Sequence, residues 1–406
     1  MLRFARRMGT ARRSFVREIL KVTQDPTIIS FAGGLPNPRF FPLAELARAT
    51  EKTMAYSGTA ALQYSTTEGF PPLREYIADR YKRRGVHVDP DDVLITNGSQ
   101  QGLDLVAKAL IDEGDTVLVE RPTYLAAIQA FGLFEPRFRA LELCEDGVRG
   151  DLIATALEED DPKLFYAIPT FQNPSGISWS AERRQEAASL LAGSDTVLVE
   201  DDPYGELRFA GEPLAPISRT PRTNELAPWA VLLGTFSKTV APGMRLGWLC
   251  ARHEVMERVI IAKQAADLQS NGFAQLVIHR YLSDNDVDGH IARIREVYGR
   301  QRDLMVHLVE TLFPPEVQCT KPQGGMFLWM TLPQGMSSME LLESSIKEKV
   351  AFVPGQAFYT DDYGENTMRL NFSNADEPMI EEGMKRLARV FGRMRAPHES
   401  HSAARR

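Results

Sequence analysis

The chain has 406 residues, of which 43% are hydrophobic and 25% charged, as is typical of a soluble globular protein with more than one hydrophobic core. A net charge of −7 argues against a general nucleic-acid binder, and no apolar stretch approaches the ~20 residues that span a bilayer. The three cysteines, Cys144, Cys250 and Cys319, are too widely separated for a disulfide framework or a zinc knuckle, so we expect a reducing, cytoplasmic location.

The N-terminal segment is strongly basic. Before the first acidic residue, Glu18, come Arg3, Arg6, Arg7, Arg12, Arg13 and Arg17. This composition is typical of an organellar transit peptide, but the apolar residues are spaced roughly as on a helix, at Phe4, Phe15, Ile19 and Leu20. Because the chain then runs directly into the apolar residues 28–31, we favour a folded amphipathic arm over a cleaved peptide.

Five short apolar runs follow, at residues 93–95, 116–119, 164–168, 196–199 and 230–233. Each run is apolar on both faces, as a strand buried in a parallel sheet should be. Helical patterns, such as 101–111 and 181–192, lie between the runs. This alternation of strands and helices predicts an α/β fold with a doubly wound, mostly parallel sheet.

The character of the chain changes past residue 250. A long helical region runs from about His253 to Leu312 and breaks near residues 284–288. After it, strand-like runs at 327–330, 350–353 and 368–372 precede a helical pattern at 379–394. We therefore expect four parts: an arm at 1–45 that packs on the small domain and the active site, a large domain at 46–290, a smaller α+β domain at 291–395 and a disordered tail at 396–406.

Ligands of open α/β sheets bind outside the carboxyl ends of the strands. The five runs lead into residues 96–101, 121–124, 169–176, 200–204 and 234–238. Taken one at a time, the polar residues there have ordinary structural explanations, with Ser99 as a helix N-cap, Tyr124 as a packing residue, Asn173 in a turn before proline, Asp201 or Asp202 in an exposed turn, and Lys238 as a surface charge.

Together, these residues are what pyridoxal 5′-phosphate requires. Lys238 follows a buried strand, where an ammonium group can lose its proton and form an imine with an aldehyde. One carboxylate of the pair at residues 201–202 can hold the pyridinium nitrogen, and hydroxyl groups with Arg245 can bind the phosphate. We therefore expect this cofactor and no metal.

Seven motifs carry a resemblance to a known family: Phe31-Ala32-Gly33-Gly34-Leu35-Pro36-Asn37-Pro38, Leu62-Gln63-Tyr64-Ser65, Asn97-Gly98-Ser99-Gln100-Gln101, Asn173-Pro174-Ser175-Gly176, Asp201-Asp202-Pro203-Tyr204, Gly234-Thr235-Phe236-Ser237-Lys238 and Met368-Arg369-Leu370-Asn371-Phe372. In this order they resemble the class I, fold-type I pyridoxal-phosphate aminotransferases, and most of all the branch with the 2-aminoadipate and kynurenine aminotransferases. The resemblance implies a large domain with a mostly parallel central sheet between helices, a smaller α+β domain, and a homodimer.

The resemblance also implies a role for each matching residue. Lys238 would be the Schiff-base lysine and the base that moves a proton between substrate and cofactor. Asp201, which stands first in Asp-x-x-Tyr, would pair with the pyridinium, leaving Asp202 structural. The other implied cofactor contacts are Tyr204 and Asn173 at the ring oxygen, Tyr124 stacked on the ring, Ser99, Gln100, Thr235, Ser237 and Arg245 at the phosphate, and Tyr64 at the phosphate of the other subunit. Lys238, Asp201 and Tyr204 are the expected catalytic residues.

For the substrate, the resemblance implies that Arg369 clamps the α-carboxylate, helped by Asn173 and by the backbone near Gly34. We expect the substrate side chain to lie among the arm, residues 35–41, the neighbouring subunit's tyrosine and residues 268–271. Arg17 and Arg39 are candidates for an acidic side chain, although each can equally face solvent or pair with a local acid.

The expected activity is transfer of the amino group of an L-amino acid to a 2-oxo acid, 2-oxoglutarate or pyruvate, in a ping-pong cycle. The same site can run a β-lyase, decarboxylase or oxidase reaction, because the surrounding pocket decides the outcome. A third hypothesis is a non-catalytic sensor, but retention of Lys238, Asp201 and Arg369 argues against it. Regulators in the family carry a winged-helix DNA-binding domain ahead of the Gly-Gly-Leu-Pro loop, for which we expect no room before Gly33. One mild departure from the family pattern is Thr235, where close relatives often have serine.

Overall fold

The structure is a computed structural model that describes residues 3–10, 19, 25–220 and 222–403. Its centre is an eight-stranded sheet with the order β2–β9–β8–β7–β6–β3–β4–β5. The strands are β2 (Val93–Thr96), β3 (Thr116–Arg121), β4 (Arg137–Cys144), β5 (Gly147–Val148), β6 (Leu164–Ala167), β7 (Val197–Asp201), β8 (Ala230–Thr235) and β9 (Gly247–Ala251). The five predicted runs form β2, β3, β6, β7 and β8, and the predicted α/β fold is confirmed.

Three strands of this sheet, β4, β5 and β9, were not predicted from the sequence. Strand β9 lies between β2 and β8 and is antiparallel to both, so the sheet is mixed rather than wholly parallel. Strand β4 is parallel to β3 and alternates between exposed and covered residues in its first half. Its half-buried pattern differs from the continuous apolar pattern of the central strands, which is why the search for apolar runs missed it.

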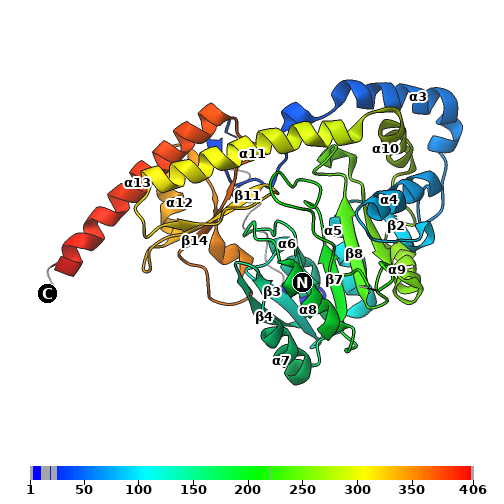
Figure 1. Ribbon diagram of the computed structural model, residues 1–406, viewed down its shortest axis with the longest axis horizontal. Helices are drawn as coiled ribbons and strands as arrows, with labels where there is room; N and C mark the ends of the chain where they lie inside the picture. The colour runs from blue at the N-terminus through cyan, green and yellow to red at the C-terminus, as the bar shows by residue number, and fades with distance from the viewer. Residues whose placement is uncertain (1–2, 11–18, 20–24, 221, 404–406) are drawn as a thin grey trace.

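Alternate residues of each central strand face two separate cores. Leu118 packs in one cluster, with α4 (Pro71–Arg83), α7 (Gly150–Asp160), α8 (Ala181–Leu191) and α10 (Gly272–Asp284). Its neighbours Val117 and Val119 pack in another, with α5 (Ser99–Leu110), α6 (Leu125–Gly132) and α9 (His253–Ala266). Helices therefore cover both faces of the large sheet and bury its central strands (Figure 1).

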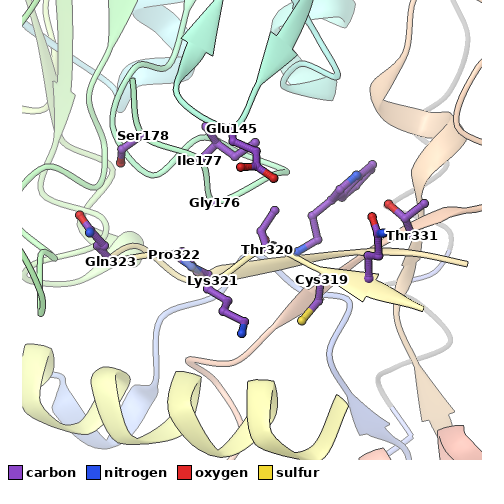
Figure 2. Close-up of a pocket in the computed structure, with 12 residues that line it drawn as sticks. Glu145, Gly176, Ile177, Ser178, Cys319, Thr320, Lys321, Pro322, Gln323 and Thr331 are labelled. Carbon is purple, nitrogen blue, oxygen red and sulfur yellow. Dashed lines mark hydrogen bonds between the residues drawn. The ribbon is translucent and has the colours of Figure 1, made fainter. Parts of the chain in front are cut away.

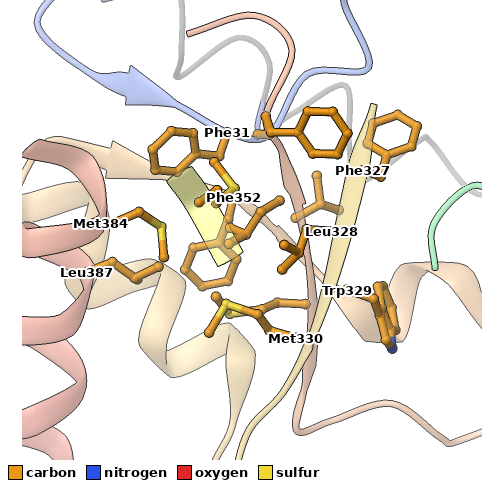
Figure 3. Packing of buried hydrophobic residues seen from close by; sticks show 14 of the residues in the cluster. Phe31, Phe327, Leu328, Trp329, Met330, Phe352, Met384 and Leu387 are labelled. Carbon is orange, nitrogen blue, oxygen red and sulfur yellow. The ribbon is translucent and has the colours of Figure 1, made fainter. Parts of the chain in front are cut away.

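The second sheet is antiparallel, with the order β10–β11–β14–β13. Its strands are β10 (Gln318–Cys319), β11 (Phe327–Thr331), β13 (Val353–Pro354) and β14 (Thr367–Asn371), and its helices are α12 (Ser338–Lys347) and α13 (Glu377–Ala403). Figure 3 shows the buried side chains of this region, among them Phe31, Leu328, Phe352 and Met384. Phe31 joins this core because β1 (Ile29–Ser30) pairs in parallel with β12 (Val350–Ala351).

Helix α11 (Val287–Leu312) connects the two regions (Figure 1). Val287 and Ile291 at its start pack in a core of the large sheet, whereas Ile294 and Tyr298 already pack in the core of the small sheet. Helix α3 (Leu43–Ala61) lies against α10, and short 3₁₀ helices occur at Pro38–Phe40, Pro90–Asp92, Pro242–Met244 and Gly355–Phe358. The two regions are therefore tied by one continuous helix rather than by a flexible linker.

The described parts of the N-terminal arm contact both regions. Ile19 packs in the core of the small sheet, as the expected position of the arm requires. Arg6, beside the short helix α1 (Arg7–Thr10), instead forms an ion pair with Glu135, at 2.9 Å, and contacts Glu113, and both acids belong to the large-sheet region. Arg17, a candidate for substrate recognition, lies outside the described residues.

The C-terminal tail differs from the expectation of disorder from residue 396. Helix α13 continues to Ala403, and residues 404–406 lie outside the described part. Met394 still packs against the small-sheet core, and adding a turn to a helix that already exists is much easier than starting one. Within the described ranges, no helix combines the length and apolarity that crossing a membrane requires.

Candidate active site

The predicted site residues converge on one cavity of about 260 Å³ at the carboxyl ends of the strands. Loops after β2, β3, β6, β7 and β8 reach this cavity, as does β14 of the small sheet. The predicted residues that line it are Gly34, Ser99, Gln100, Tyr124, Asn173, Asp201, Tyr204, Thr235, Ser237, Lys238, Arg245 and Arg369. Tyr64 is the exception, because its side chain is exposed and lies outside the cavity.

Lys238 lies three residues past the end of β8, and its Nζ donates a hydrogen bond to the carbonyl oxygen of Gly34 at 2.8 Å. Burial lowers the pKa of this ammonium group to about 8, and the nearby cations Arg369 and Arg245 contribute to the shift. A lysine with such a pKa is partly neutral near pH 7, so it can act as a nucleophilic amine or as a base.

Asp201 ends β7 and is 2% exposed. Its Oδ2 accepts a hydrogen bond from the Tyr166 hydroxyl at 2.9 Å, while its Oδ1 has no hydrogen-bond partner among the residues that the structure describes. Burial raises the pKa of this carboxyl group to about 7. A cationic nitrogen placed beside Oδ1 would satisfy the orphaned oxygen and stabilise the ionised carboxylate.

Asp202 points to a different partner, which separates the two adjacent carboxylates. Its Oδ2 accepts a hydrogen bond from Arg84 Nη2 at 2.6 Å, and its side chain is almost fully buried. Successive side chains of an extended strand point to opposite faces, so only one of the two carboxylates can reach the cavity. This geometry favours Asp201 as the ligand and Asp202 as a structural ion pair.

Arg369 lies on β14 and is 3% exposed. Its Nη1 donates to Asn173 Oδ1 at 2.8 Å and its Nη2 to the carbonyl oxygen of Ala32 at 2.7 Å, while the buried Nε has no partner among the described residues. The guanidinium carbon lies 4.2 Å from the ring centre of Phe327 and 5.0 Å from that of Phe358. The fork is therefore held rigidly, and only two of its five N–H groups are donated in these bonds, so the others can bind an anionic ligand such as a carboxylate.

The turn before α5 is built for close approach. Gly98 has φ +79°, where a side chain strains the backbone, and a Cβ atom there would lie 2.6 Å from Arg245 Nη2 and displace the end of that side chain. Arg245 Nη2 in turn donates to the carbonyl oxygen of Asn97 at 3.2 Å. Gly98 is the N-cap, and Ser99 is the first helical residue, so Ser99 is not the N-cap that its plain structural explanation required.

Hydroxyl groups complete this side of the cavity. Thr235 Oγ1 donates to Ser237 Oγ at 2.9 Å, and both side chains are buried near Arg245 in the cavity wall. The first N–H groups of a helix have no partner within the helix, so the start of α5 adds further donors. Backbone donors, hydroxyl groups and an arginine together suit a phosphate group.

Three features of the cavity suit the same kind of ligand. The orphaned Asp201 Oδ1 suits a cationic ring nitrogen, the cup at Gly98 and Arg245 suits a phosphate, and the amine of Lys238 suits an aldehyde. The residues present therefore fit the cofactor that the sequence resemblance implies. Tyr124 lines the same cavity at the start of α6, where a ring can stack on a planar ligand.

A larger cavity of about 550 Å³ lies between residues 176–178 and strands β10 and β11 (Figure 2). None of the predicted site residues lines it. Its one lysine, Lys321, forms an ion pair with Glu310 at 2.6 Å. Size alone would select this cavity, but the chemistry of the side chains selects the smaller one. In the described part of the chain, no cluster of three or more His, Cys, Asp or Glu residues is arranged to hold a metal.

Sequence reasoning missed several residues that shape the site. Tyr166, the partner of Asp201, looks like any other residue of an apolar strand, and Phe327 and Phe358 look like ordinary core residues. Arg39, a candidate for an acidic substrate side chain, is 71% exposed and pairs with Asp376 at 3.1 Å. Its local ion pair is the alternative that the sequence had left open.

Comparisons with known proteins place the chain among aminotransferases. The family model "Aminotransferase class I and II" matches residues 32–387. Aromatic-amino-acid aminotransferase 1 of Thermococcus litoralis is 42% identical, over 93% of this chain and 91% of its own length. The 2-aminoadipate transaminase of Thermus thermophilus is 41% identical, over 96% of each chain. A crystal structure of α-aminoadipate aminotransferase from Thermus thermophilus with N-(5′-phosphopyridoxyl)-L-leucine has a TM-score of 0.90 and 39% identity, covering 97% of this chain and 98% of the other.

Proposed function

Because the chain belongs to the class I and II aminotransferase family, we propose that it moves the amino group of an L-amino acid to a 2-oxo acid, 2-oxoglutarate or pyruvate, in a ping-pong cycle. It is an aminotransferase, and its cofactor is pyridoxal 5′-phosphate. The main support for the finer proposal is one cavity that collects a buried amine at Lys238 with a carboxylate oxygen of Asp201 and a guanidinium N–H of Arg369 that have no partner in the described part of the chain.

When bound, pyridoxal phosphate supplies an aldehyde that reacts with amines and a protonated ring that withdraws electron density from the substrate Cα. We propose that Lys238 is the Schiff-base lysine that bonds to this aldehyde. Asp201 keeps the ring nitrogen protonated, since a buried carboxylate is stabilised by an adjacent cation. Tyr204 and Asn173, whose side chains hydrogen-bond to each other, would donate to the ring oxygen.

The remaining residues position the reactants. Ser99, Gln100, Thr235, Ser237 and Arg245 would hold the phosphate, and Tyr124 would stack on the ring. Arg369 would bind the substrate α-carboxylate through its free Nε, with Asn173 and the backbone at Gly34 beside it. With substrate in the cavity, the neutral amine of Lys238 would serve as the base that takes the proton from the substrate Cα and delivers it to the cofactor.

The proposal extends to a homodimer with shared sites. Tyr64 is 81% exposed and lies outside the cavity of its own chain. Leu62 and Leu268 are exposed as well, and Gln269, next to Leu268, accepts a hydrogen bond from the backbone N–H of Ser65. Exposed apolar and aromatic side chains of this kind suit a subunit interface, from which Tyr64 would reach the other subunit's phosphate.

We also propose the domain limits 1–45, 46–290 and 291–395, and a cytoplasmic location.

Subunit mixing tests the shared site. A hybrid of a Tyr64→Ala subunit and a Lys238→Ala subunit has one cavity with both native residues only if Tyr64 acts across the interface. We therefore expect mixing of the two inactive or weakened proteins to restore activity. If Tyr64 acts in its own subunit, the mixture gains nothing.

The reaction itself is tested with the pyridoxal-phosphate-loaded enzyme and single L-amino acids, without a 2-oxo acid. The relatives' names make 2-aminoadipate and aromatic amino acids the first substrates to try. We expect about one equivalent of 2-oxo acid per active site, and repeated turnover only after 2-oxoglutarate or pyruvate is added. Continuous release of ammonia or hydrogen peroxide without an acceptor would replace the proposal with the lyase or oxidase alternative.

A further inference from the structure

Lys263 is a fully buried lysine that the proposed mechanism does not use. It lies on α9, is 0% exposed, and donates from Nζ to both carboxylate oxygens of Asp267, at 2.9 and 3.1 Å. Burial lowers the pKa of its ammonium group, while Asp267 acts in the opposite direction. Burying an ion pair costs solvation energy, so its position calls for an explanation beyond stability.

The pair holds Asn97, just before the N-cap of α5, and Gln101, in the first turn of α5. Asp267 Oδ2 accepts from Asn97 Nδ2 and from Gln101 Nε2, each at 2.6 Å. Gln101 Oε1 accepts from the Asn97 backbone N–H at 2.8 Å and from Lys263 Nζ at 3.1 Å. Asn97 and Gln101 flank Gly98, Ser99 and Gln100, the part of the turn that faces the cavity. The turn therefore takes its shape from side chains on another helix.

The charges of the pair also suit a phosphate site. A lone carboxylate under a turn that binds a dianion would repel the dianion, and the effect would be strong where water is largely excluded. The ammonium group of Lys263 cancels this charge while the carboxylate keeps its two amide donors. Arg245 and the start of α5 then remain as the net positive features of the cup.

We propose that Lys263 and Asp267 are positioning residues that set the affinity of this site for the phosphate group of its cofactor. They do not touch the phosphate but act through Asn97 and Gln101. The inference rests on the proposed assignment of Ser99 and Arg245 to the phosphate, not on which amino acid the enzyme uses.

The test measures ligand binding to cofactor-free protein, with pyridoxal 5′-phosphate, pyridoxal and inorganic phosphate as probes. Lys263→Met has nearly the same length but no charge, and it leaves the carboxylate of Asp267 unbalanced. We expect it to weaken pyridoxal 5′-phosphate and inorganic phosphate about tenfold or more, the scale of one charge-assisted hydrogen bond, and to leave pyridoxal within about twofold. Lys263→Arg, which keeps the charge, should retain most of the affinity.

The chain offers a matched control in Lys108→Met. Lys108 forms an ion pair with Asp104 at 2.5 Å, with the same spacing of four residues, on α5 itself but away from the turn. Lys108→Met removes one positive charge but leaves the hydrogen bonds of Lys263 and Asp267 intact, so we expect the same affinity as in the native protein for all three probes. Lys263→Gln is a second variant in case Lys263→Met does not fold. It also removes the charge, so it should likewise weaken the binding of pyridoxal 5′-phosphate and inorganic phosphate.

Four possible results distinguish the proposal from its alternatives. Selective loss of the phosphate-bearing probes in the Lys263 variants supports the proposal. Unchanged affinities, or an equal loss for pyridoxal, would overturn it, because the pair would then be neutral or merely structural. If the native protein itself did not prefer pyridoxal 5′-phosphate to pyridoxal, the phosphate assignment would fail too. Native protein that binds the cofactor but transfers no amino group would instead refute only the proposed reaction.

Discussion

The ionisation of Lys238 in the cofactor-free protein tests the electrostatics of the site directly. Burial, with help from Arg369 and Arg245, lowers its pKa from the ordinary value of 10.5 to about 8. Only a neutral amine is nucleophilic, and at pH 7 about 9% of such a lysine is neutral, against about 0.03% for a lysine at the ordinary value. At this pH the neutral fraction of Lys238 is therefore about 300 times that of an ordinary lysine.

Competitive labelling with trace acetic anhydride measures this quantity. The acetylation of Lys238 is followed by mass spectrometry of its peptide between pH 6 and pH 11, relative to a free amino acid standard. The neutral fraction rises about tenfold per pH unit below the pKa and levels off above it, so we expect a midpoint near pH 8. A labelling rate that keeps rising past pH 10 would refute the argument that burial and the two cations depress this pKa.

Two substitutions should shift the midpoint in opposite directions. Asp201→Asn removes the carboxylate that stabilises the ammonium form, so the pKa of Lys238 should fall. Arg369→Leu removes a cation that destabilises that form, so the pKa should rise, and each shift should be about one unit or less. Asp202→Asn serves as the control, because Asp202 is engaged with Arg84 and should leave the midpoint in place. Shifts of the same sign in both site variants would contradict the assignment.

Three further substitutions test individual contacts. Arg369→Lys keeps the charge but loses the planar fork, so kcat/KM for amino acids should fall about 10- to 150-fold in steady-state assays, and an unchanged value would remove Arg369 from the carboxylate clamp. Asp202→Asn leaves the guanidinium of Arg84 without its charged partner, so urea unfolding should show a loss of about 1–3 kcal/mol, with the absorbance spectrum of the bound cofactor unchanged. Gly98→Ala places a Cβ atom against Arg245 at a φ of +79°, so calorimetry should show weaker binding of inorganic phosphate to the cofactor-free protein. Binding as tight as that of the native protein would exclude this turn as the phosphate site.

Local sequence patterns were enough to predict the framework of the fold. The five apolar runs are strands because a strand covered on both faces has to be apolar at every position, as at Val117, Leu118 and Val119. The carboxyl ends of parallel strands share one edge, so reading the residues after each run identified most of the cavity wall before any distance was known. The predicted family and cofactor are confirmed by the comparisons.

Patterns of this kind could not identify β9, which follows β8 after a loop rich in small and polar residues and inserts between β2 and β8. Nor could they separate Asp201 from Asp202 on physical grounds. That distinction depends on Tyr166 and Arg84, which lie 35 and 118 residues away from their partners along the chain. Nor does the composition of the tail indicate that helix α13, which is packed at Met394, continues past residue 395.

The sequence by itself determined the class of fold, the strand ends whose residues reach the cavity and most of the side chains that line it. Only the tertiary structure decided how those side chains are held. Arg369 gains its orientation from Asn173, 196 residues away, and from Ala32, 337 residues away, and Asn97 is anchored by Asp267, the C-cap of α9, 170 residues away. Hydrogen bonds and ion pairs act over a few ångströms in space, whatever the separation along the chain, so the tuning of this site becomes visible only once the chain is folded.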